Sequence, residues 1–151
     1  MEENDFVNQI GKLTYSYVRI DLLISNIAFE LKLNEQLYDF FADTRFADKL
    51  EKLINMIRIA QLDTELKNKL IDWLNKVDDC RKKRNIVIHS IILNNVEKPN
   101  ELKAFNYKKL KGKIIREIHD FTIQDLNNLN EYFVDIHNEG IGIYDKIINV
   151  A

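Results

Sequence analysis

The sequence predicts an all-α protein, an up-and-down bundle of four main helices with a basic insertion before the last one. Apolar residues recur at spacings of three and four over several long segments, which places them on one side of a helix. Only one proline and four glycines interrupt the 151 residues, of which 46% are hydrophobic and 30% charged. This composition is typical of a globular protein, and the length suits a single domain over residues 1–151.

Two helices are expected in the first part of the chain, over residues 6–31 and 46–60. The apolar stripe of the longer one consists of Phe6, Ile10, Leu13, Tyr17, Ile20, Ile24, Ile27 and Leu31. The shorter one repeats the same spacing with Phe46, Leu50, Leu53, Ile57 and Ala60. The aromatic stretch LYDFFADTR (37–45) between them is predicted to pack as a loop or a single turn.

A third helix is expected to begin at LDTEL (62–66), where Asp63 or Thr64 supplies an N-cap. We expect this helix to continue to about Leu93, because apolar residues keep its spacing over much of that length. The first members of the stripe are Leu66, Leu70, Trp73, Val77 and Cys80.

The fourth helix is expected to begin at FTIQDL (121–126). Thr122 there is followed three residues later by Asp125, a variant of the capping box. The stripe that follows consists of Leu126, Leu129, Phe133, Ile136, Gly140, Ile143 and Ile147. Gly140 in this stripe either lets another helix approach closely or marks a break in the helix.

Between the third and fourth helices lie about 28 residues, 94–121, around the only proline, Pro99. Connections inside a compact domain are usually ~4 to 6 residues long, so some local structure is expected in this segment. LKAFNYKK (102–109) and KIIREIHDF (113–121), separated by LKG (110–112), favour a small hairpin that projects from the bundle.

Composition and motifs exclude several classes of protein. The single cysteine, Cys80, allows no internal disulfide and no cysteine-based zinc site, which fits a reducing cytoplasm. The acidic start has no signal-peptide pattern and no stretch approaches a membrane span, so a cytoplasmic protein without a membrane partner is expected. His119 and His137 lack matching ligand spacings, and no phosphate-binding loop or nucleophile elbow occurs. No metal and no cofactor are therefore expected.

The positive charge is concentrated, although the net charge is only -2. Half of the 22 basic residues lie in the two segments 81–84 and 98–116, and the second of these contains a single acid, Glu101. Phe105 and Tyr107 lie among these lysines, so the segment could follow a phosphate backbone and stack on bases. A lysine-rich loop that is merely solvated is an equally good interpretation of this feature alone.

The third helix contains a local conflict at Arg84. Continuing its spacing past Cys80 gives Arg84, Val87 and Ile91, so an arginine occupies a position that the pattern reserves for an apolar residue. Such a guanidinium must meet a carboxylate, reach water or face a cleft that admits an anion. Arg81, Asn85 and His89 are spaced four residues apart, so they form a row on the helix beside the apolar stripe. Arg84 and His89 are separated by about 140° around the helix and ~7.5 Å along it.

The segment RNIVIH (84–89) resembles the R-x4-6-H motif of HEPN domains, in which the second position is commonly Asn, Asp or His. The resemblance extends over most of the chain. A long first helix, a long central helix ending in the motif, a basic insertion and a closing helix that begins at FTIQDL are similar to the arrangement of small bacterial HEPN proteins. In some HEPN toxins a tyrosine modified by the antitoxin follows the histidine by two residues, but here that position is Ile91.

The resemblance implies a metal-independent endoribonuclease that works as a homodimer, with the two motif-bearing helices facing each other. An RNA 2′-hydroxyl would attack the adjacent phosphorus and leave a 2′,3′-cyclic phosphate. His89 would act as acid or base, Arg84 would hold the phosphate and Asn85 would orient one of them. The expected RNA-binding residues are Arg81, Lys82, Lys83, Lys108, Lys109, Lys111 and Lys113. Such a protein could be a toxin with a protein antitoxin, or a phage-defence component.

Two alternatives stay open. Many HEPN-like proteins are non-catalytic dimeric helical modules that bind a partner protein or RNA. Arg84 could also be a structural residue that forms an ion pair with Asp78 or Asp79, although both spacings fit a helix poorly.

Overall fold

The structure is a computed structural model that describes residues 3–43, 45–89, 91–94 and 101–150. Most of these residues are helical, as the sequence predicts, and a three-stranded antiparallel sheet precedes the last helix. The elements are, in chain order, α1 (Glu3–Glu30), α2 (Asn34–Ala42), α3 (Phe46–Ile59), α4 (Thr64–His89), β1 (Ile91–Asn94), β2 (Glu101–Leu110), β3 (Lys113–Thr122) and α5 (Ile123–Val150).

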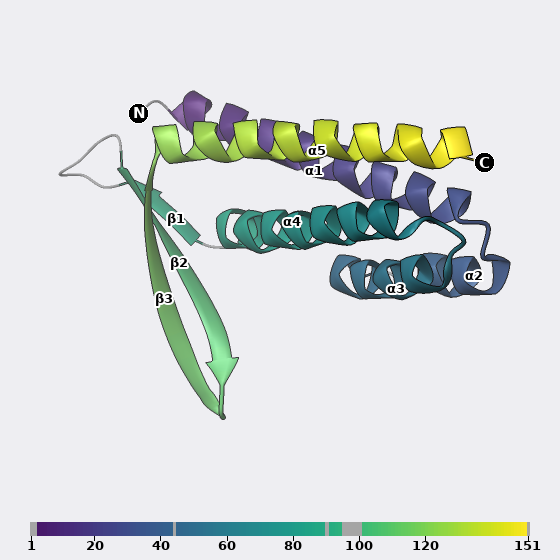
Figure 1. Cartoon of the computed structure of the whole chain (residues 1–151). Coiled ribbons are helices and arrows are strands. Elements are labelled where there is room, and N and C mark those ends of the chain that lie inside the picture. The colour runs from purple at the N-terminus through teal and green to yellow at the C-terminus, as the bar shows by residue number, and fades with distance from the viewer. Residues whose placement is uncertain (1–2, 44, 90, 95–100, 151) are drawn as a thin grey trace.

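Helices α1 and α5 lie side by side and run in the same direction, with α4 beneath them and α3 and α2 on its other side (Figure 1). The side-chain amide of Asn130 on α5 donates to the backbone carbonyl of Gln9 on α1, at 3.1 Å. Helix α4 runs antiparallel to α5, as two hydrogen bonds between them show. The Trp73 indole donates to the Ile136 carbonyl, and the Tyr132 hydroxyl donates to Asp79. A later residue of α4 therefore contacts an earlier residue of α5.

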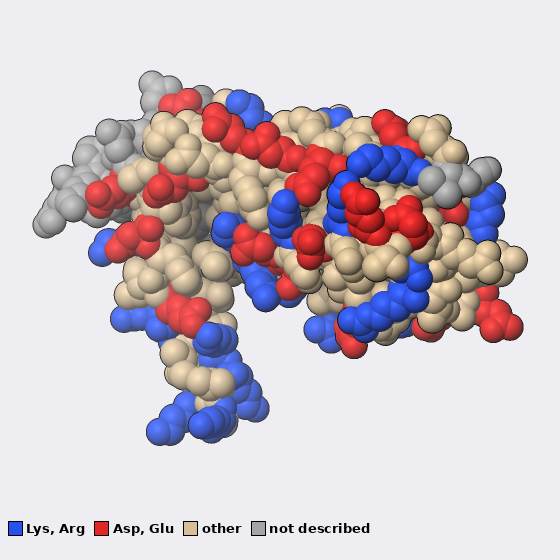
Figure 2. All heavy atoms as spheres, viewed as in Figure 1, with Lys and Arg blue, Asp and Glu red and all other residues tan. Residues whose placement is uncertain are grey.

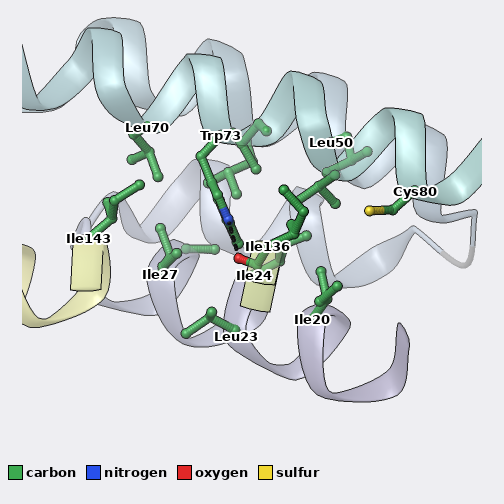
Figure 3. Packing of buried hydrophobic residues seen from close by; sticks show 14 of the residues in the cluster. Ile20, Leu23, Ile24, Ile27, Leu50, Leu70, Trp73, Cys80, Ile136 and Ile143 are labelled. Carbon is green, nitrogen blue, oxygen red and sulfur yellow. Dashed lines mark hydrogen bonds between the residues drawn. The ribbon is translucent and has the colours of Figure 1, made fainter. Parts of the chain in front are cut away.

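Trp73 lies at the centre of the core, where α1, α4 and α5 meet (Figure 3). Its ring is fully buried, and its indole Nε1 donates a hydrogen bond of 2.7 Å to the Ile136 carbonyl. A Cβ atom at Gly140 would overlap the Trp73 ring and lie 2.7 Å from a methyl group of Leu23. Helix α5 continues without interruption through Gly140. The glycine therefore serves the close approach of helices, and the alternative of a helix break is wrong.

Side-chain caps fix the starts of α4 and α5. Asp63 is the cap of α4, because its Oδ1 accepts the backbone N–H of Leu66 at 2.8 Å. At α5 the Thr122 hydroxyl accepts the backbone N–H of Asp125 at 3.1 Å, and the Asp125 carboxylate accepts that of Thr122 at 2.7 Å. The reciprocal capping box expected at residues 122–125 is thus confirmed.

Two expectations about helix boundaries are wrong. Residues 34–42 form a nine-residue helix, α2, rather than a loop or a single turn. Helix α4 ends at His89 instead of about Leu93, because Ile91–Asn94 pair with Leu102–Phe105 of β2 as strand β1. The segment is rich in β-branched residues, which favour strands where a pairing partner is present. Lys98 and Pro99, which belong to the predicted basic segment, lie outside the described residues.

The predicted hairpin is confirmed and projects from the helices (Figure 1). Strands β2 and β3 pair along their whole length, from Glu101 opposite Thr122 to Leu110 opposite Lys113. Lys111 and Gly112 link them with φ values of 48° and 77°, the positive values that a two-residue type I′ turn requires. No helix among the described residues is both long enough and apolar enough to cross a membrane.

Candidate functional site

A solvent-open hollow of about 420 Å³ lies between α1, the start of α3 and the last turns of α4. It contains two of the three motif residues, Arg84 and Asn85. Three guanidinium groups and one carboxylate line it, and two of the guanidinium groups are ion-paired with carboxylates outside the lining, Arg45 with Asp48 and Arg81 with Asp78. The lining residues are Tyr17, Asp21, Arg45, Phe46, Ala47, Arg81, Arg84 and Asn85.

Arg84 enters this hollow from the core-facing side of α4. Its guanidinium carbon lies 4.7 Å from the centroid of the Tyr17 ring, within the range of a cation–π interaction. Its Nη1 donates to the side-chain oxygen of Asn85 at 3.2 Å. Its Nε is buried and has no hydrogen-bond partner, and no carboxylate of the described chain forms an ion pair with it. Arg84 therefore has no direct ion-pair partner in the described chain, although the carboxylate of Asp21 lines the same hollow.

The two aspartates near Arg84 on the sequence are engaged elsewhere. Arg81 donates through Nε to Asp78 at 2.7 Å, and Lys82 contacts the second oxygen of Asp78 at 3.2 Å. Burial alone would raise the pKa of Asp78, but the hydrogen bonds from these two cations outweigh it and leave that pKa lowered. Asp79 accepts from Lys83 at 3.0 Å. The structure thus does not pair Arg84 with either aspartate.

Two other groups in the neighbourhood cannot act as bases or nucleophiles at neutral pH. Burial raises the pKa of Tyr17 to about 12 despite the opposing charge of Arg84, so its phenol stays protonated and its ring serves as a support. Burial likewise raises the pKa of Cys80 to about 12, which keeps its thiol protonated.

His89 is the last residue of α4 and is exposed. It is not among the residues that line the hollow, and it lies about 140° around the helix from Arg84. Asn85 is one turn before His89 on α4 and also bonds to Arg84. One chain therefore brings Arg84, Asn85 and Arg81 together but leaves His89 on another side of the same helix end.

The predicted RNA-binding lysines fall into two separate groups. Lys82 and Lys83 are ion-paired on α4, and Lys83 also lies 4.7 Å from the centroid of the Tyr132 ring. The other group lies on the hairpin, whose end is crowded with Lys and Arg side chains (Figure 2). Its members are Lys108 in β2, which pairs with Glu117, and the exposed Lys109, Lys111 and Lys113.

Sequence reasoning missed the other five residues that line the hollow, among them Tyr17, which supports Arg84, and the charged residues Asp21 and Arg45. Tyr17 was expected in the core stripe of the first helix, and it does pack against Phe46 with ring centroids 5.0 Å apart. One oxygen of Asp21 is buried without a hydrogen-bond partner. No spacing rule within one helix identifies these residues, because α1, α3 and α4 meet only in the folded chain.

A second cavity of about 520 Å³ lies between α4, β3 and α5. Its lining is mainly apolar, with Val87, Phe121 and Leu126 among its residues, and Lys83 is the only predicted site residue in it. No group of three or more side chains suited to hold a metal ion occurs in the described part of the chain.

Comparisons of the chain with protein-family models, with curated proteins and with solved structures find no match.

Proposed function

We propose that this chain is a metal-independent endoribonuclease that works as a homodimer, as the resemblance of RNIVIH to the HEPN motif implies. The observation that carries the proposal is the state of Arg84. This guanidinium is supported by Tyr17 and Asn85, has no carboxylate partner in the described chain, and faces an open hollow. A guanidinium in this state is suited to bind a phosphate, since its planar fork matches two phosphate oxygens.

The proposed reaction is an internal transesterification of RNA. The 2′-oxygen forms a bond to the adjacent phosphorus while the bond from phosphorus to the 5′-oxygen of the next nucleotide breaks. One group accepts the proton of the 2′-hydroxyl and one donates a proton to the leaving oxygen. His89 can fill one of these roles, because histidine changes its charge between pH 5 and 8. Arg84 stabilises the negative charge that develops on the phosphoryl oxygens.

A second copy of the chain completes the site in this proposal. Within one chain, His89 does not reach the hollow that holds Arg84. If the ends of two α4 helices face each other, the histidine of one copy can lie beside the arginine of the other. Both Arg84 and the exposed His89 lie near the end of α4, which is the part of the helix that the two copies would share.

A second candidate function is a non-catalytic helical module that binds a partner protein. It is favoured by an exposed apolar face on α1 and α5, opposite the core. Tyr15, Leu22 and Phe29 on α1 are about 60% exposed and recur every seven residues. Val134, Ile141 and Ile148 on α5 are partly exposed at the same spacing, and Tyr15 and Val134 line the same groove. Seven-residue spacing on adjacent helices is typical of a surface that another helix covers.

A cleavage assay separates the two candidates. The wild-type protein, in the presence of a chelator, is mixed with a pool of RNA sequences and compared with Arg84→Ala and His89→Ala. The nuclease proposal predicts cleavage by the wild type and a loss of about 100-fold or more in each variant. His119→Ala, which changes a histidine on β3, is the matched control and should cleave like the wild type. Absence of cleavage favours the binding module, whereas equal cleavage by all proteins would rule out Arg84 and His89 as the catalytic residues.

A further inference from the structure

The two faces of the projecting hairpin differ in chemistry. Residues directly opposite each other in an antiparallel pair point to the same face, and successive residues alternate between faces. The register therefore assigns one face, here called the Tyr107 face, to Phe105, Tyr107, Lys109, Ile114, Arg116 and Ile118. The opposite face, here called the Lys108 face, carries Asn106, Lys108, Leu110, Lys113, Ile115 and Glu117.

Only the Lys108 face neutralises part of its own charge. Lys108 forms an ion pair with Glu117, and hydrogen bonding to Lys108 lowers the pKa of that carboxyl group. On the Tyr107 face, the Arg116 guanidinium lies 5.7 Å from the centroid of the Phe105 ring. Neither Arg116 nor Lys109 has a carboxylate partner among the residues that the structure describes. The Tyr107 face therefore presents unpaired cations next to aromatic rings.

The Tyr107 face also carries large side chains that are exposed. Tyr107 is 54% exposed, Ile114 80% and Ile118 49%. Strand β1 covers the edge of β2 only as far as Phe105, so the outer part of the hairpin is a two-stranded ribbon. Such ribbons are marginally stable alone, and a ligand that covers one face would stabilise this one.

We propose that the Tyr107 face binds single-stranded RNA, with the Tyr107 ring stacked on a base and with Lys109 and Arg116 on the flanking phosphates. Aromatic rings between unpaired cations are the combination that binds single strands without sequence preference. The charge of the ribbon favours a polyanion over an apolar partner protein, because five of its residues from 105 to 118 are basic and one is acidic. The choice of RNA rests on the proposed function, whereas the choice of face rests on the hairpin itself.

Binding is measured by fluorescence anisotropy with a labelled single-stranded oligonucleotide of mixed sequence. Its 2′-hydroxyls are methylated, which removes the attacking group and prevents cleavage during the titration. Tyr107→Thr is compared with Leu110→Thr on the Lys108 face, a similarly exposed residue on the same strand. Threonine suits both positions because it favours strands. We expect Tyr107→Thr to weaken binding about 10-fold, Leu110→Thr less than about 2-fold, and Tyr107→Phe to bind like the wild type.

A second measurement keeps an aromatic side chain at the tested position. Tryptophan is introduced as Tyr107→Trp or as Leu110→Trp, and its fluorescence is followed as the oligonucleotide is added. The native Trp73 is fully buried and contributes the same background to both proteins. Quenching of the tryptophan at 107 but not at 110 is the expected result, because only the former is to stack on a base.

The salt dependence tests the phosphate contacts. The double variant Lys109→Gln and Arg116→Gln should reduce the slope of a plot of log affinity against log salt concentration by about 1.4. The control is the double variant Lys69→Gln and Lys76→Gln, which removes the same charge from α4 and should leave the slope unchanged.

Equal effects on both hairpin faces, equal quenching at 107 and 110, or no binding of the oligonucleotide would overturn the inference. If the chain cleaves RNA while Tyr107→Thr binds normally, the inference fails and the proposed function stands. If the face binds as expected but the chain cleaves nothing, the proposed function fails and the inference stands.

Discussion

The guanidinium of Arg84 on α4 is held over the ring of Tyr17 on α1, with its carbon 4.7 Å from the ring centroid. This contact explains how a cation can occupy a position in the apolar stripe of α4. The face of the Tyr17 ring attracts the positive charge through a cation–π interaction, and the side-chain oxygen of Asn85 accepts a hydrogen bond from one guanidinium N–H group. The Nε of Arg84 is buried without a hydrogen-bond partner, so only the outer N–H groups of the guanidinium can face the hollow between α1, α3 and α4.

Changing Tyr17 tests whether this support matters for the proposed reaction. In Tyr17→Leu the cation–π contact is lost, so Arg84 should be held less firmly and metal-free RNA cleavage should slow by about 3- to 10-fold. Tyr17→Phe keeps the ring and should cleave like the wild type. The initial rate of cleavage is the measurement, with thermal unfolding as the check on folding. Equal slowing in Tyr17→Leu and Tyr17→Phe would show that the ring face is not what supports Arg84.

Two glycines on α5 should respond to alanine in opposite directions. Gly140→Ala places a methyl group on the Trp73 ring and near Leu23, so the free energy of unfolding should fall by about 2 kcal/mol. Gly142→Ala adds a methyl group where no atom lies within 4 Å, and it should raise the free energy of unfolding by up to ~1 kcal/mol through helix propensity. Urea unfolding of the two variants measures both values. A neutral Gly140→Ala would mean that α4 and α5 pack less closely than the structure shows.

The capping box before α5 should contribute measurably to stability. Thr122→Ala removes the hydroxyl that accepts the Asp125 N–H, and it should lower the free energy of unfolding by about 1 kcal/mol. Gln124→Ala, a change at an exposed residue in the first turn, is the control and should stay within about 0.5 kcal/mol of the wild type. Chemical unfolding at a fixed pH gives both numbers. The cap would lose its assigned role if both variants were equally stable.

Stability should fall as the solution is acidified below neutral pH. Burial of His137, with a smaller contribution from the charge of Arg19, lowers its pKa from the ordinary value of 6.5. Between the lowered pKa and 6.5 the unfolded chain binds a proton at this residue that the folded chain does not. The stability present above about pH 6.5 is therefore lost as the pH falls toward the folded-state pKa.

The variant His137→Gln isolates this effect because glutamine does not titrate. The difference in unfolding free energy between the wild type and His137→Gln, measured in urea from pH 8 to pH 5, should move against the wild type as the pH falls. A difference that stays constant, or that moves in favour of the wild type, contradicts the assignment of a lowered pKa to His137.

Sequence patterns predicted the long helices, the caps and the hairpin because each depends on residues close together in the chain. The capping pair Thr122 and Asp125 and the turn at Lys111 and Gly112 are local chemistry of this kind. Helix α2 was missed because its cap position, Leu33, makes no side-chain hydrogen bond and its aromatic run has no clear period. The end of α4 was missed because the apolar spacing continues to Ile91, and only the distant strand β2 makes the strand conformation favourable there.

The candidate site likewise has features that are visible within one helix and features that arise only from contacts between distant segments. The conflict at Arg84 was visible because an arginine interrupts an apolar stripe on one helix. Its support by Tyr17 was not visible, since α1 and α4 are far apart in sequence. The separation of Lys108 from Lys109 required the strand register, which a basic composition does not reveal.

The most direct test of the nuclease proposal is the chemistry of the cleavage product formed without metal. An RNA of defined sequence is cleaved in chelator and compared with the same RNA carrying a single 2′-deoxynucleotide on the 5′ side of the cleaved bond. The account predicts a 2′,3′-cyclic phosphate from the first RNA, no cleavage at that bond in the second, and loss of activity in both Arg84→Ala and His89→Ala. Cleavage of the deoxy-substituted bond, or undiminished activity in either variant, would contradict it.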